Sequence, residues 1–200
     1  VLTKGVYWVG AIDWGIRDFH GYSTPKGTTY NAYLIEDEKV ALIDTVKSPF
    51  SNELLARISE IVRPGEIDYL VMNHLEMDHS GSIVEVRKRA KKAKVIASQK
   101  GKEGLIRHYG GDLGATVVKT GDEIGLGGRT LTFVEAPMLH WPDSMFTYLK
   151  EDHILLPNDA FGQQSRPRAD SMMRWVTLWT TQRNTMQTSL CRLPRWSRGR

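Results

Sequence analysis

The sequence predicts a mixed α/β fold in which helices cover the faces of a sheet. Segments rich in β-branched and aromatic residues alternate along the chain with amphipathic helical segments. Several of the strand-like segments run directly into polar loops. The composition is that of a globular domain, with 40% hydrophobic and 25% charged residues. A chain of 200 residues is long enough to bury a sizeable core in one unit.

The N-terminal part of the chain supplies strands and one well-marked helix. Residues 6–12 read as a strand, and residues 30–35 and 40–43 as a strand pair joined by an acidic turn. A helix then starts near Ser48, which can cap it, and Pro49 suits its first position. Apolar residues recur at helical spacing up to position 62, so this helix has one buried face.

The rest of the chain continues the alternation without an internal repeat. We expect strands at 67–72, 94–97, 116–118, 130–135, 145–149 and 153–156, and helices at 82–93 and 100–109. The basic run within residues 82–93 is typical of a solvated helix face. In such a layered fold, functional residues are expected where strands end.

Charge is distributed unevenly along the chain. Although the net charge is +4, residues 165–200 hold eight arginines and a single acidic residue, and residues 1–164 are mildly acidic. An acidic body argues against a nucleic-acid surface. There is no apolar run of the roughly 18 residues that a membrane span needs, and Cys191, the one cysteine, excludes an intrachain disulfide. We therefore expect a cytoplasmic protein that binds neither nucleic acid nor membrane.

Four potential metal ligands follow the predicted strand at 67–72. His74, Glu76, Asp78 and His79 lie within six residues. Side chains alternate along a strand, and a turn at the last two positions can bring all four together. Such a cluster is costly without a counter-charge, which a metal supplies. Ligands without a thiolate suit iron, manganese or zinc, and a carboxylate at position 76 favours iron; a solvated acidic loop is the simpler alternative.

Two further candidate ligands follow later strands. His140 comes after the strand at 130–135, and Asp159 after the strand at 153–156. Alone, His140 would be interpreted as a packed or surface histidine and Asp159 as a turn residue. Together with the first cluster, both become stronger candidates for metal ligands. We interpret Asp143 as a turn residue.

The arrangement resembles the metal-binding pattern of the metallo-β-lactamase superfamily. A glutamate at position 76, where hydrolytic members have histidine, marks the flavodiiron branch (A-type flavoproteins, including rubredoxin:oxygen oxidoreductase and coenzyme F420H2 oxidase). The resemblance rests on His74-x-Glu76-x-Asp78-His79, on His140 and Asp159, and on segments 27–34, 42–45, 139–145 and 158–163. It implies a metallo-β-lactamase-like αββα sandwich over residues 1–164, incomplete at the C-terminus.

The resemblance also implies a centre of two irons. It assigns His74, Glu76 and His140 to one iron, Asp78 and His79 to the other, and Asp159 to a bridge between them. Such a shared carboxylate suits a two-metal site. By the same resemblance Glu76 and Trp141 lie toward a flavin, His20 lies near the substrate pocket, and Asp44 has a supporting or structural role.

In the flavodiiron family this site reduces O2 to water or NO to N2O. Electrons come from FMN in a C-terminal flavodoxin-like domain, from donors such as rubredoxin or coenzyme F420H2, and the chains pair head to tail as homodimers. The family pattern ends after Gln163, so we expect that flavin domain and a last histidine ligand to be missing, and the second metal to be weakly held.

Alternatives remain at this stage. Residues 165–200 are rich in arginine and tryptophan. We favour an out-of-frame segment as their origin, ahead of a natural truncation or divergent tail, and ahead of a segment that contacts nucleic acid or membrane. The chain as a whole could instead be a zinc metallo-hydrolase of the same superfamily, or an inactive fragment of the oxidoreductase.

Overall fold

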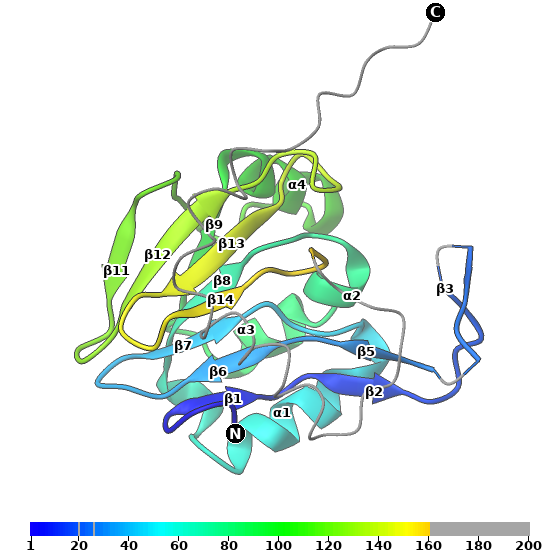
Figure 1. The fold of residues 1–200 in the computed structure, drawn as a ribbon, viewed down its shortest axis with the longest axis horizontal. Helices are drawn as coiled ribbons and strands as arrows, with labels where there is room; N and C mark the ends of the chain where they lie inside the picture. The colour runs from blue at the N-terminus through cyan, green and yellow to red at the C-terminus, as the bar shows by residue number, and fades with distance from the viewer. Residues whose placement is uncertain (20, 26, 161–200) are drawn as a thin grey trace, which may run out of the picture. The chain divides into compact units, whose positions relative to one another are not determined.

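A six-stranded sheet forms the centre of the computed structural model, which describes residues 1–19, 21–25 and 27–160 (Figure 1). Its strands, in spatial order, are β1 (Val6–Trp8), β6 (Tyr33–Ile35), β7 (Val40–Ile43), β8 (Ile67–Met72), β9 (Lys94–Ala97) and β10 (Thr116–Val117). The strands from β7 to β10 are parallel, whereas β6 is antiparallel to both of its neighbours. The carboxyl ends of β7, β8 and β9 therefore meet at one edge of the sheet.

A second sheet is antiparallel throughout. It contains β11 (Glu123–Gly125), β12 (Thr130–Glu135), β13 (Met145–Leu149) and β14 (Ile154–Leu156) in sequence order. Two short strand pairs lie outside both sheets: β2 (Ala11–Asp13) with β5 (Thr28–Tyr30), and β3 (Asp18–Phe19) with β4 (Tyr22–Ser23).

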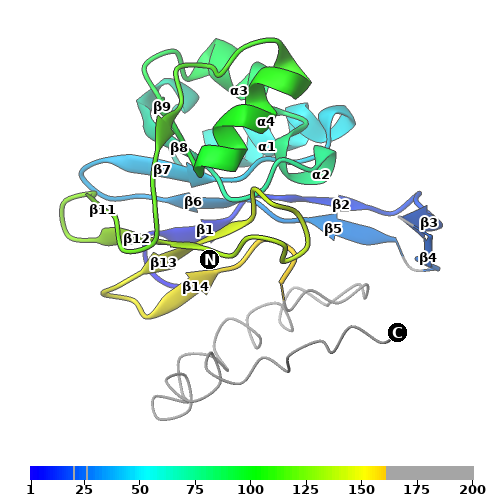
Figure 2. The ribbon, with the colours of Figure 1, turned by 90° about the horizontal axis from the view of Figure 1, so that it is seen from above.

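The helices lie on the face of the six-stranded sheet that points away from the second sheet (Figure 2). They are α1 (Ser51–Ser59), α3 (Ile83–Arg89) and α4 (Gln99–Tyr109), with the one-turn helix α2 (Met77–Ser80) at the end of β8 and short 3-10 turns at Ser48–Phe50 and Pro64–Glu66. Residues 1–160 thus form helix, sheet and sheet layers of the expected metallo-β-lactamase-like fold. The outer helix layer beyond the second sheet is not found among these described residues.

Alternate residues of the central strands fill the cores on the two faces of the six-stranded sheet. Leu42 and Leu70 are neighbours in the register of β7 and β8, and both pack with the helices in one buried cluster. Ile43 and Val71 form the next pair and are fully buried outside that cluster. Since successive strand residues point to opposite faces, this second pair faces the other sheet. No helix in the described part of the chain has the length and apolar character needed to cross a bilayer.

The element predictions hold best in the sheets. The strands predicted at 67–72, 94–97, 130–135 and 145–149 have those bounds in the structure. The single strand predicted at 6–12 is wrong, since β1 and β2 are separated at Gly10. There the backbone passes so close to Tyr30 that a Cβ would lie 2.0 Å from its carbonyl oxygen.

Two helix predictions need correction as well. Ser48 does not cap the first helix but begins a 3-10 turn, and α1 starts three residues later, at Ser51, with Phe50 in the N-cap position. The helix predicted at 82–93 ends at Arg89. The guanidinium of Arg87 donates to the carbonyl oxygens of Ala90, Lys91 and Ala93. These carbonyl groups, at and beyond the helix end, thus have a hydrogen-bond donor without further helical turns.

Candidate metal centre

The loop after β8 places four polar side chains at the sheet edge. His74, Asp78 and His79 are buried, with relative exposures of 0%, 7% and 3%. Asp78 and His79 lie in α2 rather than in a turn, and the amides of His79 and Ser80 both donate to the carbonyl oxygen of Glu76. This single helical turn folds the chain back, so that positions 78 and 79 approach position 74.

The first set of donors draws on three separate loops. His74, Glu76, His140 and Asp159 each contribute a nitrogen or oxygen atom, and these atoms all lie within 4.8 Å of one another. The Nε2 atom of His140 is 3.1 Å from Glu76 Oε2 and 3.3 Å from Asp159 Oδ2. His74 Nε2 is 3.3 Å from the same Glu76 oxygen. His140 is the exposed member, with 56% of its side chain accessible.

The second set shares one residue with the first. Asp78, His79 and Asp159 bring their donor atoms within the same 4.8 Å limit. Asp159 Oδ1 lies 2.9 Å from His79 Nε2, whereas its Oδ2 lies 3.5 Å from His74 Nε2. The two oxygens of one carboxylate therefore face two different groups of ligands. Among the described residues the first set has four donors and the second has three.

Asp143 fixes the ring of His74. Its Oδ2 atom lies 3.0 Å from His74 Nδ1 and accepts a 2.8 Å hydrogen bond from the amide of Leu75. The hydroxyl of Ser98, which follows β9, donates to the backbone carbonyl of Asp143. With Nδ1 engaged in this way, Nε2 is left to face the centre, an arrangement common behind metal-binding histidines.

Asp44 supports the same loop from the end of β7. Its Oδ1 accepts a 2.7 Å hydrogen bond from the amide of Asn73, and its Oδ2 lies 3.5 Å from His79 Nδ1. The backbone at Asp44 is left-handed, with φ of 56°. Thr45 adds hydrogen bonds from its amide and its hydroxyl to the carbonyl oxygen of His79. Both histidines of the loop thus have an aspartate behind the ring.

The charges of these residues are strongly coupled. Burial alone would raise the pKa of Asp159, but the hydrogen bond from His79 and the nearby imidazoles lower that pKa to about 2. Burial opposes protonation of His79, yet its contacts with Asp159 and Asp44 raise its pKa well above the usual value. Burial raises the pKa of Asp78. In the absence of a cation, these contacts favour the protonated forms of His74 and His79, whose positive charge offsets the nearby carboxylates.

The donor set fits a pair of divalent cations. Asp78 Oδ1 and His79 Nδ1 are buried without a hydrogen-bond partner among the described residues. Unpaired buried polar atoms are costly unless another group satisfies them. A cation on the site side would satisfy the carboxylate of Asp78, and its binding at His79 Nε2 would leave the one proton of that ring on Nδ1, which faces Asp44. Imidazole and carboxylate donors without sulfur suit iron, manganese or zinc.

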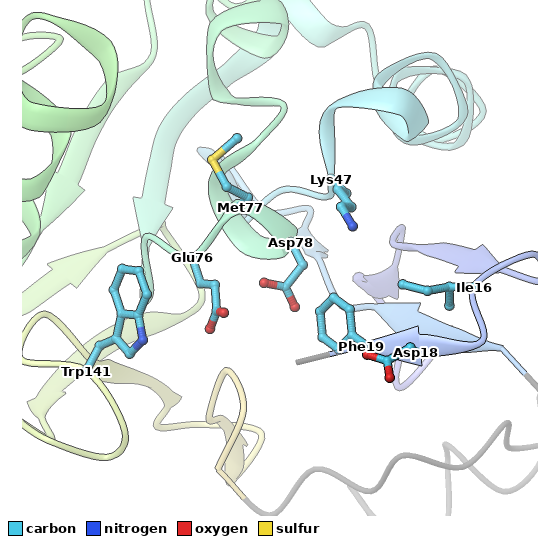
Figure 3. A pocket seen from close by; sticks show the side chains of 8 residues that line it. All are labelled: Ile16, Asp18, Phe19, Lys47, Glu76, Met77, Asp78 and Trp141. Atoms are coloured by element: carbon cyan, nitrogen blue, oxygen red, sulfur yellow. The ribbon is translucent and has the colours of Figure 1, made fainter. Parts of the chain in front are cut away.

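A pocket of about 410 Å³ lies beside the cluster (Figure 3). Its wall is made of Ile16, Asp18, Phe19, Lys47, Glu76, Met77, Asp78 and Trp141. Glu76 and Asp78 belong both to this wall and to the donor sets, so a molecule in the pocket reaches the centre directly. The indole of Trp141 stands edge-on to the ring of His74, with centroids 5.3 Å apart.

The structure brings together the donor atoms of all six residues predicted as ligands, in two groups that share Asp159; their role as iron ligands stays a prediction. Asp143 does lie in a turn, as predicted, but it is also 4% exposed and bonded to His74, a supporting role that the sequence reasoning missed. Its sequence signal was weak: an aspartate three positions after His140, in a loop that returns to the site. Sequence reasoning also missed Asn73, a buried residue next to His74. The predictions for His20 and for residues 165–200 fall outside the described residues.

Comparisons with known proteins agree with this fold. A family model described as "ODP family beta lactamase" matches residues 28–189. A nitric oxide reductase of Moorella thermoacetica is 55% identical over 165 residues, which cover 81% of this chain and 41% of that protein. Among solved structures, the flavodiiron protein of Giardia intestinalis has a TM-score of 0.79 at 42% identity, covering 87% of this chain and 44% of its own. Rubredoxin oxygen:oxidoreductase of Desulfovibrio gigas has a TM-score of 0.82 at 42% identity, with 88% and 46% covered. The chain thus spans less than half the length of these relatives.

Proposed function

Because the chain belongs to the flavodiiron protein family, with an ODP family β-lactamase domain, we propose that it forms the diiron part of an oxidoreductase that reduces O2 to water or NO to N2O. Two of the similar proteins carry matching names, one a nitric oxide reductase and the other a rubredoxin oxygen:oxidoreductase. The activity is proposed for the complete protein to which these residues correspond.

Six side chains would hold the irons. His74, Glu76 and His140 would bind the first iron, Asp78 and His79 the second, and Asp159 would bridge both. The observation that carries this proposal is the position of Asp159, whose two oxygens face different histidines at 2.9 Å and 3.5 Å. One carboxylate between two cations lowers their mutual repulsion and sets a short separation. The part of the chain that the structure describes offers three donors to the second position and four to the first, so we expect the second iron to be the more weakly held.

The protein residues around the irons have distinct tasks. When bound, two ferrous irons supply electrons and coordination positions for O2 or NO. Asp143 and Asp44 hold the rings of His74 and His79 in place. Trp141 shields one side of His74 from water, while the pocket leaves Glu76 accessible. The site is thus rigid on its protein side and open on the pocket side.

Electrons would enter through the pocket. Glu76 and Trp141, which line the pocket, would face the FMN carried by a flavodoxin-like domain of a second, head-to-tail copy, and rubredoxin or coenzyme F420H2 would reduce that flavin. A reducing cytoplasm suits a centre of ferrous iron. Both the donor and the dimer are part of the proposal.

Metal content and activity test the proposal together. The purified chain is made metal-free, loaded anaerobically with ferrous iron, and supplied with chemically reduced FMN while O2 or NO is monitored. We expect two irons per chain, and consumption of O2 or NO faster than with reduced FMN and the metal-free chain. A chain that binds zinc alone and cleaves a thioester or a β-lactam would instead establish the hydrolase.

A further inference from the structure

Asn73 connects the two sheets at the end where the candidate ligands gather. It directly follows β8 of the six-stranded sheet and is 1% exposed. Its side-chain nitrogen donates to the carbonyl oxygen of Leu156, the last residue of β14, at 2.9 Å. Its side-chain oxygen accepts a 2.7 Å hydrogen bond from Thr147 of β13. Every polar atom of this side chain is therefore bonded to the opposite sheet.

The backbone of Asn73 extends the same connection. Its carbonyl oxygen accepts a 2.9 Å hydrogen bond from the amide of Met145, and its own amide donates to Asp44 at 2.7 Å. Asn73, the residue immediately before His74, thus joins the end of β8 to the ends of β7, β13 and β14. Buried amides with all their bonds made hold a position more firmly than apolar contacts, which have no fixed direction.

Asn158 completes the link on the other side. Its side-chain oxygen accepts a 2.6 Å hydrogen bond from the amide of Asp159, and its side-chain nitrogen donates to the carbonyl of Met145 at 2.9 Å. The same nitrogen lies 3.5 Å from the carbonyl oxygen of Asn73. The backbone of Asn158 is left-handed, with φ of 43°, a conformation that asparagine tolerates better than most residues.

We infer that Asn73 and Asn158 are positioning residues that set Asp159 against the two ligand groups of the 74–79 loop. This inference rests on the proposed diiron function. Asp159 comes from the second sheet, whereas His74, Asp78 and His79 come from the first. The contact between these ligands therefore depends on how the two sheets are held together at this edge. Hydrogen bonds of Asn73 and Asn158 make that connection. Asn73 is next to His74 in the sequence, and Asn158 is next to Asp159.

A purely structural role would have a different signature. If the two amides only stabilised the fold, their loss would lower the free energy of unfolding of the metal-free chain and leave its metal affinity unchanged. If they position Asp159, their loss weakens both metal positions, because this carboxylate belongs to both sets. Residues that orient metal ligands typically contribute about 10–100-fold in affinity.

Substitutions at Asn158 separate the two roles. Asn158→Gly tolerates the left-handed backbone but removes the side-chain bonds to Asn73, Met145, Asp159 and Ala160. Asn158→Asp keeps an oxygen for the amide of Asp159 and loses the bond to Met145. Thr147→Val retains the shape of the side chain and frees only the oxygen of Asn73. Asp68→Asn is the control: Asp68 lies in the first part of β8, bonded to Val40 and Lys92, so it affects the fold away from the centre.

Ferrous iron is titrated anaerobically into the full metal-free chain against a competing chelator, and Mössbauer spectra report whether two irons form a coupled pair. We expect Asn158→Gly to lower the affinity for both irons by about 10–100-fold and to weaken the coupling. Asn158→Asp and Thr147→Val should show smaller losses, and Asp68→Asn none.

The outcomes distinguish this inference from the proposed function. If the unaltered chain binds two irons and Asn158→Gly binds them with equal affinity and coupling, the inference is wrong while the proposed function stands. If Asn158→Gly does not fold, unchanged affinity in both Asn158→Asp and Thr147→Val overturns the inference. If the unaltered chain binds no iron, the proposed function fails and the inference with it.

Discussion

Asp143 belongs to neither donor set, yet removing its carboxylate should weaken metal binding through its effect on His74. Asp143 Oδ2 serves two buried groups, His74 Nδ1 at 3.0 Å and the amide of Leu75 at 2.8 Å. Asp143→Ala leaves both without a partner, and each unsatisfied buried group costs about 1–3 kcal/mol in the free energy of unfolding. It also releases the ring of His74, so the direction of Nε2 is no longer fixed.

The expected loss of iron affinity is about 10–100-fold, equivalent to about 1.4–2.7 kcal/mol. Asp143→Asn makes the test sharper. Its amide oxygen can occupy the place of Oδ2 and keep both bonds, so it removes the charge but preserves the orientation. We expect the loss of iron affinity to lie near the lower end of that range for Asp143→Asn and near the upper end for Asp143→Ala.

Equilibrium dialysis of ferrous iron under argon measures this series. Asp152→Asn is the matched control, because Asp152, in the turn between β13 and β14, pairs with Arg129 and belongs to neither donor set. Thermal unfolding of each metal-free variant checks that the fold is kept. An Asp143→Ala chain that is folded and binds iron as tightly as the unaltered chain would refute the role assigned to Asp143.

Three further outcomes are expected. Replacing Glu76 by His should shift the metal preference from iron toward zinc, because imidazole replaces a hard oxygen donor; an unchanged ratio in competitive loading, measured by elemental analysis, would count against the ligand argument. Phe133→Ala, at a fully buried side chain of β12, should lower the free energy of unfolding in urea by about 3–5 kcal/mol, and a loss below about 1 kcal/mol would mean that this core is loosely packed. Burial opposes the ionisation of Asp68, but Lys92 and the amide of Val40 lower its pKa below the usual value, so the ionised form stabilises the fold. The unaltered chain should therefore have a higher free energy of unfolding than Asp68→Asn, with the full difference above about pH 5 and a shrinking difference as the pH falls below about 4. Urea midpoints that differ equally at pH 7 and pH 3 would contradict this.

The sequence predicted the strands better than the helix ends. The β8 and β12 strands follow from short apolar runs bounded by polar or glycine turns, a local signal that packing reinforces. The end of α3 depends on Arg87 bonding to carbonyl groups beyond it, a contact that periodicity does not encode. The break at Gly10 arises because the strand passes close to Tyr30, twenty residues away in sequence.

The candidate ligands were predictable for a different reason. His74, Glu76, Asp78 and His79 are close in sequence, and their residue types alone indicate metal chemistry. Asp143 and Asn73 were not predictable as supporting residues, because their importance comes from contacts across more than 65 residues of chain with His74 and Leu156. Aspartate and asparagine are common in turns, so their type carries little information without the fold.

The metal content of the unaltered chain tests the central claim most directly. Metal-free protein is titrated anaerobically with isotopically enriched ferrous iron, and bound iron is measured by elemental analysis and by Mössbauer spectroscopy. The shared position of Asp159 predicts two irons per chain, coupled to one another, with the second more weakly held. A single isolated iron, or two irons that remain uncoupled, would contradict the bridging role of Asp159.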